Sequence, residues 1–310
     1  MSVTNFIEVT RERCRTLSAH VGFPDAQDVR IVTAAYRLLS DDVVGQVTLF
    51  ATEEQVTALA ETIGISLRTV RDRLHFLPLP DRLDRLNQAA AMVRNKALDA
   101  VLAGNISTTA EVIRAGLGQL GLAPGIKTVS GSFVMHKPFG PTYVFADCGV
   151  VIAPTVPQLV DIASESVRTW ELLMPDNPAK VAFLSYSTKG SAKHETQTRI
   201  AEAAALFKER RPDIQSDGEL QFDAAIDIDI AARKAPDSPI GGEANCFIFP
   251  SLEAGNIAYK ITQRLGGFDA YGPILQGLSG AFSDLSRGST VQDIELSVYI
   301  NILRSRAAIP

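Results

Sequence analysis

The sequence has little cysteine and no long apolar run. These absences argue against a disulfide-rich protein and against a membrane-spanning one. Its three cysteines, Cys14, Cys148 and Cys246, lie far apart and are odd in number. They predict neither a disulfide framework nor a metal site, and we expect a cytoplasmic protein because thiols stay reduced there. No stretch of about 20 residues is free of charges and proline, so no membrane span is expected. The segment 1–15 carries charges from Glu8 onward and lacks the apolar core of a secretory signal.

The sequence also lacks an excess of positive charge. Its 30 lysines and arginines face 35 acidic residues, and the net charge of −5 argues against bulk binding of nucleic acid. With 46% hydrophobic residues the chain is not mainly disordered, and its 310 residues suffice for two domains of about 150 residues each. Three motifs are absent: G-x-x-x-x-G-K-[ST], G-x-G-x-x-G after a strand, and H-E-x-x-H. The four histidines are scattered, and we expect no metal site.

What the sequence does contain is an alternation of short apolar runs and longer amphipathic stretches. In its first part it predicts strands over 20–23, 43–50, 74–79 and 100–104, each followed by a helix. Further on it predicts strands over 181–185, 215–220, 245–249 and 270–275, and helices over 156–173, 191–211, 223–234, 253–265 and 290–304. A hairpin of 128–135 with 142–145 interrupts the alternation. The pattern favours an α/β fold with mostly parallel sheets, and a second domain beginning near the hairpin.

Two polar segments follow predicted strands, where such sheets usually bind ligands. Ser185–Lys193 enters a helix through hydroxyl-bearing residues and glycine, and the helix dipole and Lys189 favour an anion there. Thr108 and Thr109 open another helix, which carries Arg114, and a guanidinium suits a phosphate. The alternative in both places is an ordinary helix cap beside a solvated cation.

A third segment gathers a hydroxyl, a guanidinium and a carboxylate over one loop and the first turn of a helix. Thr290 and Asp293 have the spacing of a capping box, which is a purely structural interpretation. In the functional interpretation Asp293 is a general base, and Ser286 and Arg287 hold an oxyanion or a phosphate. Composition does not choose between the two.

Longer stretches resemble the phosphate acetyltransferase family, closest to its ethanolamine-utilisation type. They cover much of the chain, in family-like order and spacing. These stretches are VLAGNISTTAEVIRAGLGQLGLAPG (101–125), FADCGVV (145–151), KVAFLSYSTKGSAKH (180–194), DGELQFDAA (217–225), KAPDSPIGGEANCFIFPSLEAGNIAYKITQRLGG (234–267) and YGPILQGL with DLSRGSTVQDI (271–294). A weaker match is FPDAQDVRIVTAAYRL (23–38).

The resemblance implies a reversible reaction in which acetyl-CoA and phosphate give acetyl phosphate and CoA, with no cofactor and no metal. It also implies two α/β domains with an active-site cleft between them, a C-terminal helix that returns to the first domain, and a homodimer. We therefore expect residues 1–130 with 281–310 in the first domain and 131–280 in the second.

Carried over residue by residue, the resemblance places Asp293 as the base toward the CoA thiol. Ser286 then donates a hydrogen bond to the oxyanion, a contribution typically worth about 3–4 kcal/mol, and Arg287 holds the phosphate. The expected substrate-binding residues are Arg114, Thr108, Thr109 and Lys189.

The sequence departs from the family in two places. Family members usually carry an extra stretch, including an arginine-bearing helix, between the third strand and the segment that matches 98–109. Here only residues 81–98 separate Pro80 from the next strand, and the candidates for the missing arginine are Arg82, Arg85 and Arg94. The common S-R-G-C becomes S-R-G-S, so a thiol often found near the site is a hydroxyl.

Alternatives to acetyl transfer stay open. The shortened region is compatible with propanoyl or butyryl transfer, and also with a non-enzymatic homologue that binds CoA or acyl phosphate in sensing or assembly. The acidic segment Asp217–Asp223 allows a metal-dependent dehydrogenase of related fold, or else has a structural role in positioning loops.

Overall fold

The computed structural model describes residues 6–306, which form two compact units. One unit runs as far as Pro124 and resumes at Gly272, whereas the other is the continuous segment Gly125–Tyr271. The first unit is therefore interrupted in sequence by the whole of the second. Within residues 6–306 no helix is both long and apolar enough to cross a bilayer.

The first unit is built on a sheet of five parallel strands, in the order β11-β4-β1-β2-β3. The strands are β1 (His20–Phe23), β2 (Gln46–Leu49), β3 (Leu74–Phe76), β4 (Ala100–Ala103) and β11 (Ala281–Asp284). All four residues of β4 and all four of β11 are buried, as expected for strands that are covered on both faces. Strand β11 comes from the far end of the chain and pairs with β4, so that Asp284 lies opposite Ala103.

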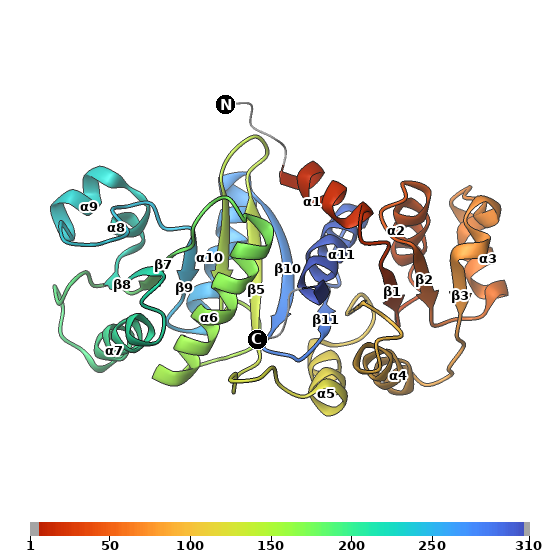
Figure 1. The fold of residues 1–310 in the computed structure, drawn as a ribbon, viewed down its shortest axis with the longest axis horizontal. Helices are drawn as coiled ribbons and strands as arrows, with labels where there is room; N and C mark the ends of the chain where they lie inside the picture. Colours follow the sequence, from red (N-terminus) through yellow and green to blue (C-terminus); the bar gives the residue numbers. More distant parts are fainter. Residues whose placement is uncertain (1–5, 307–310) are drawn as a thin grey trace. The chain divides into compact units, whose positions relative to one another are not determined.

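Helices cover both faces of this sheet (Figure 1). The contacts of α11 with α1 and α2, and of α2 with α3, gather four helices on one face, while α4 and α5 pack together on the other. Their bounds are α1 (Phe6–Arg15), α2 (Val29–Ser40), α3 (Glu53–Thr62), α4 (Arg82–Arg94), α5 (Thr109–Leu120) and α11 (Val291–Arg306). Two short 3-10 turns, η1 (Leu67–Thr69) and η2 (Arg71–Arg73), precede β3.

The second unit contains most of a six-stranded sheet in the order β10-β5-β6-β9-β7-β8. The strands are β5 (Ser130–His136), β6 (Thr142–Ala146), β7 (Lys180–Leu184), β8 (Gln215–Leu220), β9 (Cys246–Ile248) and β10 (Asp269–Gln276), the last of which runs across the boundary between the units. β5 and β6 form the predicted antiparallel hairpin, and β6, β9, β7 and β8 pair in parallel. The helices are α6 (Val156–Leu173), α7 (Glu195–Arg210), α8 (Phe222–Ile226), α9 (Ile228–Lys234) and α10 (Leu252–Gly266).

The structure confirms an α/β fold with mainly parallel sheets but corrects three local predictions. The helix expected over 223–234 is two helices, because Asp227 has extended backbone angles and its carboxylate caps α9 at the N–H of Ile230. Helix α1 and strand β11 were not predicted. β11 reads AFSD, and its second half is polar, so no apolar run marks it as a strand.

Candidate active site

The loops that follow β4 and β11 lie side by side at the carboxyl edge of the first sheet. Because the two strands are parallel neighbours, their chains leave the sheet in the same direction. The main-chain N–H of Leu285 donates to the oxygen of Ala103 at 2.6 Å, which continues the pairing past the strand ends. The structure thus brings the Thr108–Thr109 segment together with the Ser286–Arg287 segment, as expected for one anion site.

Thr108 caps α5, so its structural role is established. Its hydroxyl oxygen accepts from the N–H of Glu111, and its own N–H donates to a Glu111 carboxylate oxygen at 2.8 Å, which completes a capping box. Arg82 pairs with the other oxygen of Glu111 at 2.7 Å. Arg114 is exposed further along the helix, and no residue of the described chain pairs with its guanidinium. The N-terminal turn of α5 and Arg114 both remain available to an anion.

A buried carboxylate, absent from the sequence prediction, fixes the loop before α5. Asp25 follows β1 and is fully buried. It accepts hydrogen bonds from the N–H groups of Gly104, Ile106 and Ser107 at 2.8–3.1 Å, and from the hydroxyl of Ser107 at 2.7 Å. The sequence gives little sign of this role, because the partners of Asp25 lie about 80 positions away.

The turn of Ser286 and Arg287 is exposed, and both side chains have hydrogen-bond donors that the described residues do not use. The Ser286 oxygen accepts from the N–H of Gly288 at 3.2 Å, which leaves its hydroxyl hydrogen free to donate elsewhere. The Arg287 guanidinium has no hydrogen-bond partner within residues 6–306. Arg30, also absent from the prediction, holds this turn through the main-chain oxygens of Arg287 and Ser289.

Asp293 takes part in the capping box with Thr290, and only one of its two carboxylate oxygens is engaged there. One oxygen, Oδ2, accepts from the N–H and the hydroxyl of Thr290 at 2.8 and 2.9 Å, and Thr290 in turn accepts from the Asp293 N–H. The other oxygen, Oδ1, makes no hydrogen bond within the described part of the chain. The capping-box interpretation is therefore right, and a role for Oδ1 as a base is compatible with it.

Asp284, the last residue of β11, lies beneath these loops with 2% of its surface exposed. Its Oδ2 accepts from the hydroxyl of Thr109 at 2.6 Å. Burial raises the pKa of this carboxyl group to about 7, with a smaller upward effect from Asp25 and downward effects from the Thr109 hydrogen bond and from Arg287. Asp284 is thus a buried carboxyl group with a raised pKa beside a candidate anion site.

Lys189 belongs to the second unit, in the loop after β7. It forms an ion pair with Asp217, and its loop is held by Glu219, which accepts from the N–H of Gly190 at 2.7 Å and the hydroxyl of Ser187 at 3.0 Å. In the same acidic segment Asp223 pairs with Lys234 at 2.7 Å. These carboxylates hold loops and lysines, which is the structural role that the sequence left open. Within residues 6–306 no three His, Cys, Asp or Glu side chains gather as a metal site.

The three arginines proposed for the missing family arginine are all engaged in contacts of their own. Arg85 donates to the main-chain oxygens of Pro24, Leu79 and Pro80, and Arg94 donates to that of Gln119. Arg82 pairs with Glu111 of the α5 capping box, and of the three it is the one whose contact lies at the start of α5. The geometry therefore favours Arg82 over the other two as a contributor to this site.

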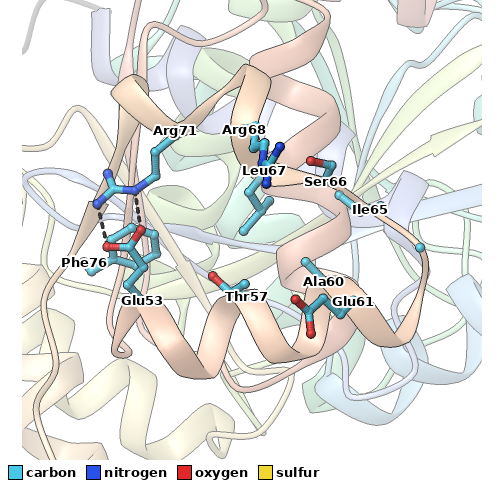
Figure 2. A pocket seen from close by; sticks show the side chains of 11 residues that line it. Glu53, Thr57, Ala60, Glu61, Ile65, Ser66, Leu67, Arg68, Arg71 and Phe76 are labelled. Carbon is cyan, nitrogen blue, oxygen red and sulfur yellow. Dashed lines mark hydrogen bonds and ion pairs between the residues drawn. The ribbon is translucent and has the colours of Figure 1, made fainter.

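A separate pocket of about 590 Å³ lies beside α3 and β3, the edge strand opposite β11 (Figure 2). Arg71 lines this pocket, and its guanidinium donates to both carboxylate oxygens of Glu53. The same guanidinium lies 4.9 Å from the centre of the Phe76 ring. Arg68 lies at the other side of the same pocket. None of the predicted site residues lines it, so this pocket is not the candidate site.

Comparison with known proteins decides the family. The family model described as phosphate acetyl/butaryl transferase matches residues 81–302. A phosphate acetyltransferase of Paracoccus denitrificans is 39% identical over 312 residues, covering 95% of this chain and 98% of the relative. The chain belongs to the phosphate acetyl/butaryl transferase family.

Solved structures agree with that membership. The EutD phosphotransacetylase from Staphylococcus aureus superposes with a TM-score of 0.86 at 32% identity, covering 97% of this chain and 98% of that one. A 4-hydroxythreonine-4-phosphate dehydrogenase from Klebsiella pneumoniae, at 11% identity and a TM-score of 0.61, shares the fold alone. The resemblance inferred from the sequence is therefore confirmed at the level of the family and of the fold.

Proposed function

We propose that this protein is a phosphate acyltransferase that moves an acetyl group reversibly between CoA and inorganic phosphate. Its family membership carries the proposal, since the relatives that match nearly the whole chain are phosphate acetyltransferases. The first unit supports it with a helix N-terminus, a serine hydroxyl, and two arginines, Arg114 and Arg287, whose guanidinium groups have no partner within residues 6–306. The reaction consumes and releases only CoA, phosphate and their acetyl derivatives, and needs no cofactor.

The proposed chemistry is one acyl transfer with no covalent enzyme intermediate. Asp293 takes the proton of the CoA thiol, because the thiolate is the competent nucleophile. The sulfur then bonds to the carbonyl carbon of acetyl phosphate, and the bond from that carbon to the bridging oxygen breaks, with both electrons leaving on phosphate. Ser286 donates to the carbonyl oxygen while it is negative.

Binding of the phosphoryl group falls to Arg287, Arg114 and the start of α5. Arginine suits this task because its fork of N–H groups matches two phosphate oxygens. Thr109 and Lys189 complete the proposed set of binding residues. The Thr108 side chain caps α5, so Thr108 contributes to binding by ordering the main-chain N–H groups at the start of that helix.

The deciding experiment measures acetyl-CoA formation from acetyl phosphate and CoA, with propanoyl and butyryl phosphates in parallel. We expect turnover with acetyl phosphate. Calorimetric binding of CoA without turnover of any of the three would instead support the sensing or assembly alternative.

We also propose a cytoplasmic homodimer. Helix α10 exposes Ile257, Ile261 and Leu265, spaced four residues apart along one stripe, and this face suits a second copy of the chain. Light scattering after size exclusion should give twice the chain mass of 33.4 kDa. A monomeric mass at micromolar concentration would contradict the dimer.

A further inference from the structure

The two loops of the candidate site are joined by one buried side chain. Asp284 ends β11, and Thr109 begins α5 after β4. Their side chains are hydrogen-bonded at 2.6 Å although they lie 175 positions apart in the sequence. Two residues after Asp284 comes Ser286, so the carboxyl group links the start of α5 to the turn that carries the proposed oxyanion donor.

The Asp284 side chain lies close to Gly104 in the loop that follows β4. A Cβ atom added to Gly104 would lie 2.3 Å from Asp284 Oδ1 and 2.4 Å from the main-chain oxygen of Leu285, and Gly104 has φ +117°, a conformation that favours glycine. The Asp284 carboxyl group therefore packs directly on the main chain of the β4 loop. Within residues 6–306 its Oδ1 has no hydrogen-bond partner, and the hydrogen bond that Thr109 donates to Oδ2 helps to orient the carboxyl group.

We propose that Asp284 is a positioning residue for the acyl transfer proposed above, because its contact with Thr109 fixes the start of α5 against the Leu285–Ser289 turn. This inference rests on the proposed function. With 2% of its surface exposed, Asp284 does not itself reach a substrate. It sets the spacing between two groups of anion-binding atoms, and small misplacements of such groups are costly in catalysis.

The position of Asp284 also couples anion binding to protonation of its carboxyl group. The ionisable groups that act on Asp284 are Asp25, which follows β1, and Arg287 in its own loop. An anion held by Arg287 and α5 adds negative charge nearby and favours the protonated carboxyl group. Binding then takes up protons, so wild-type affinity for an anion of fixed charge falls as the pH rises through the range near 7.

The test compares Asp284→Asn with Asp284→Ala. Asparagine keeps an oxygen that accepts from Thr109 and carries no charge, whereas alanine removes the contact. We expect Asp284→Ala to raise KM for phosphate about tenfold or more and to lower kcat, and Asp284→Asn to stay within about threefold of wild type at pH 7. Thr33→Val, which removes the hydroxyl bonded to Val29 within α2, is a matched control and should leave both constants unchanged.

Sulfate binding between pH 6 and 8.5 supplies a second readout, because sulfate keeps its charge over that range. Wild type should lose affinity with rising pH by at least about threefold more than Asp284→Asn. Equal pH profiles, or an Asp284→Ala variant with wild-type KM and kcat, would overturn the positioning role. If Asp284→Ala does not fold, the Asp284→Asn profile still decides. If the wild-type protein binds sulfate but shows no acyl transfer, that result refutes the proposed function and not the role of Asp284 in sulfate binding.

Discussion

Arg30 donates hydrogen bonds from one guanidinium nitrogen to the main-chain oxygens of Arg287 at 2.8 Å and Ser289 at 2.7 Å. The same side chain pairs with Asp28, the residue that caps α2. Arg30 thereby fastens the turn that presents Ser286 to the beginning of another helix. Arg30 holds this turn of the candidate site through main-chain oxygens, and Asp284, two residues before Ser286, ties the preceding strand end to α5.

Replacing Arg30 by lysine should lower kcat/KM by about tenfold, because one ammonium group cannot bridge two carbonyl oxygens and a carboxylate in the way a planar fork does. Steady-state kinetics with acetyl phosphate measure the effect. Arg37→Ala on the same helix removes only a long 3.8 Å ion pair with Glu295 and serves as the control. Equal losses in the two variants would mean that Arg30 does not hold the turn.

Asp293→Asn should reduce kcat by about 10²-fold or more, as expected when a general base is lost. Thr290→Ala breaks the same capping box but leaves the carboxylate in place, and should cost only about 1 kcal/mol of folding free energy. Comparison of the two variants by kinetics and by urea denaturation separates the base from the cap. An Asp293→Asn enzyme with wild-type rate and pH profile would show that the base lies elsewhere.

Two glycines, one in the loop before α5 and one inside that helix, should respond to alanine in opposite ways. Gly104→Ala places a methyl group against Asp284 and the Leu285 main chain at positive φ, and should destabilise the fold by about 2 kcal/mol or more. Gly118 lies exposed inside α5, and nothing lies within 4 Å of an added Cβ, so Gly118→Ala should stabilise by about 0.5–1 kcal/mol. Denaturant unfolding of both variants measures the contrast, and a similar sign for both would be unexpected.

All three thiols should be inert in the native protein. Cys14, Cys148 and Cys246 are fully buried, and burial raises the pKa of each, to about 12 for Cys14. A disulfide reagent at pH 8 should therefore modify none of them until urea is added, and activity should survive the treatment. Rapid loss of one thiol equivalent together with activity would contradict this expectation.

The sequence was informative wherever chemistry and periodicity are local. The alternation of apolar runs predicted the α/β class, and the hydroxyl and arginine residues of the two site loops could be named from the chain alone. The residues that hold those loops could not be named. Asp25 and Asp284 act on partners about 80 and 175 positions away, so that no short window of sequence shows both members of either pair. The expected cleft between the domains stays a prediction.

Strand β11 has a consequence for biosynthesis. It pairs with β4 at the edge of the first sheet, yet the ribosome makes it only after the whole segment Gly125–Tyr271. The second unit is one continuous segment, whereas the first gains its last strand by closing a loop of great length, a step that costs entropy and slows folding. The two loops of the candidate site therefore come together only after the last strand has docked on β4.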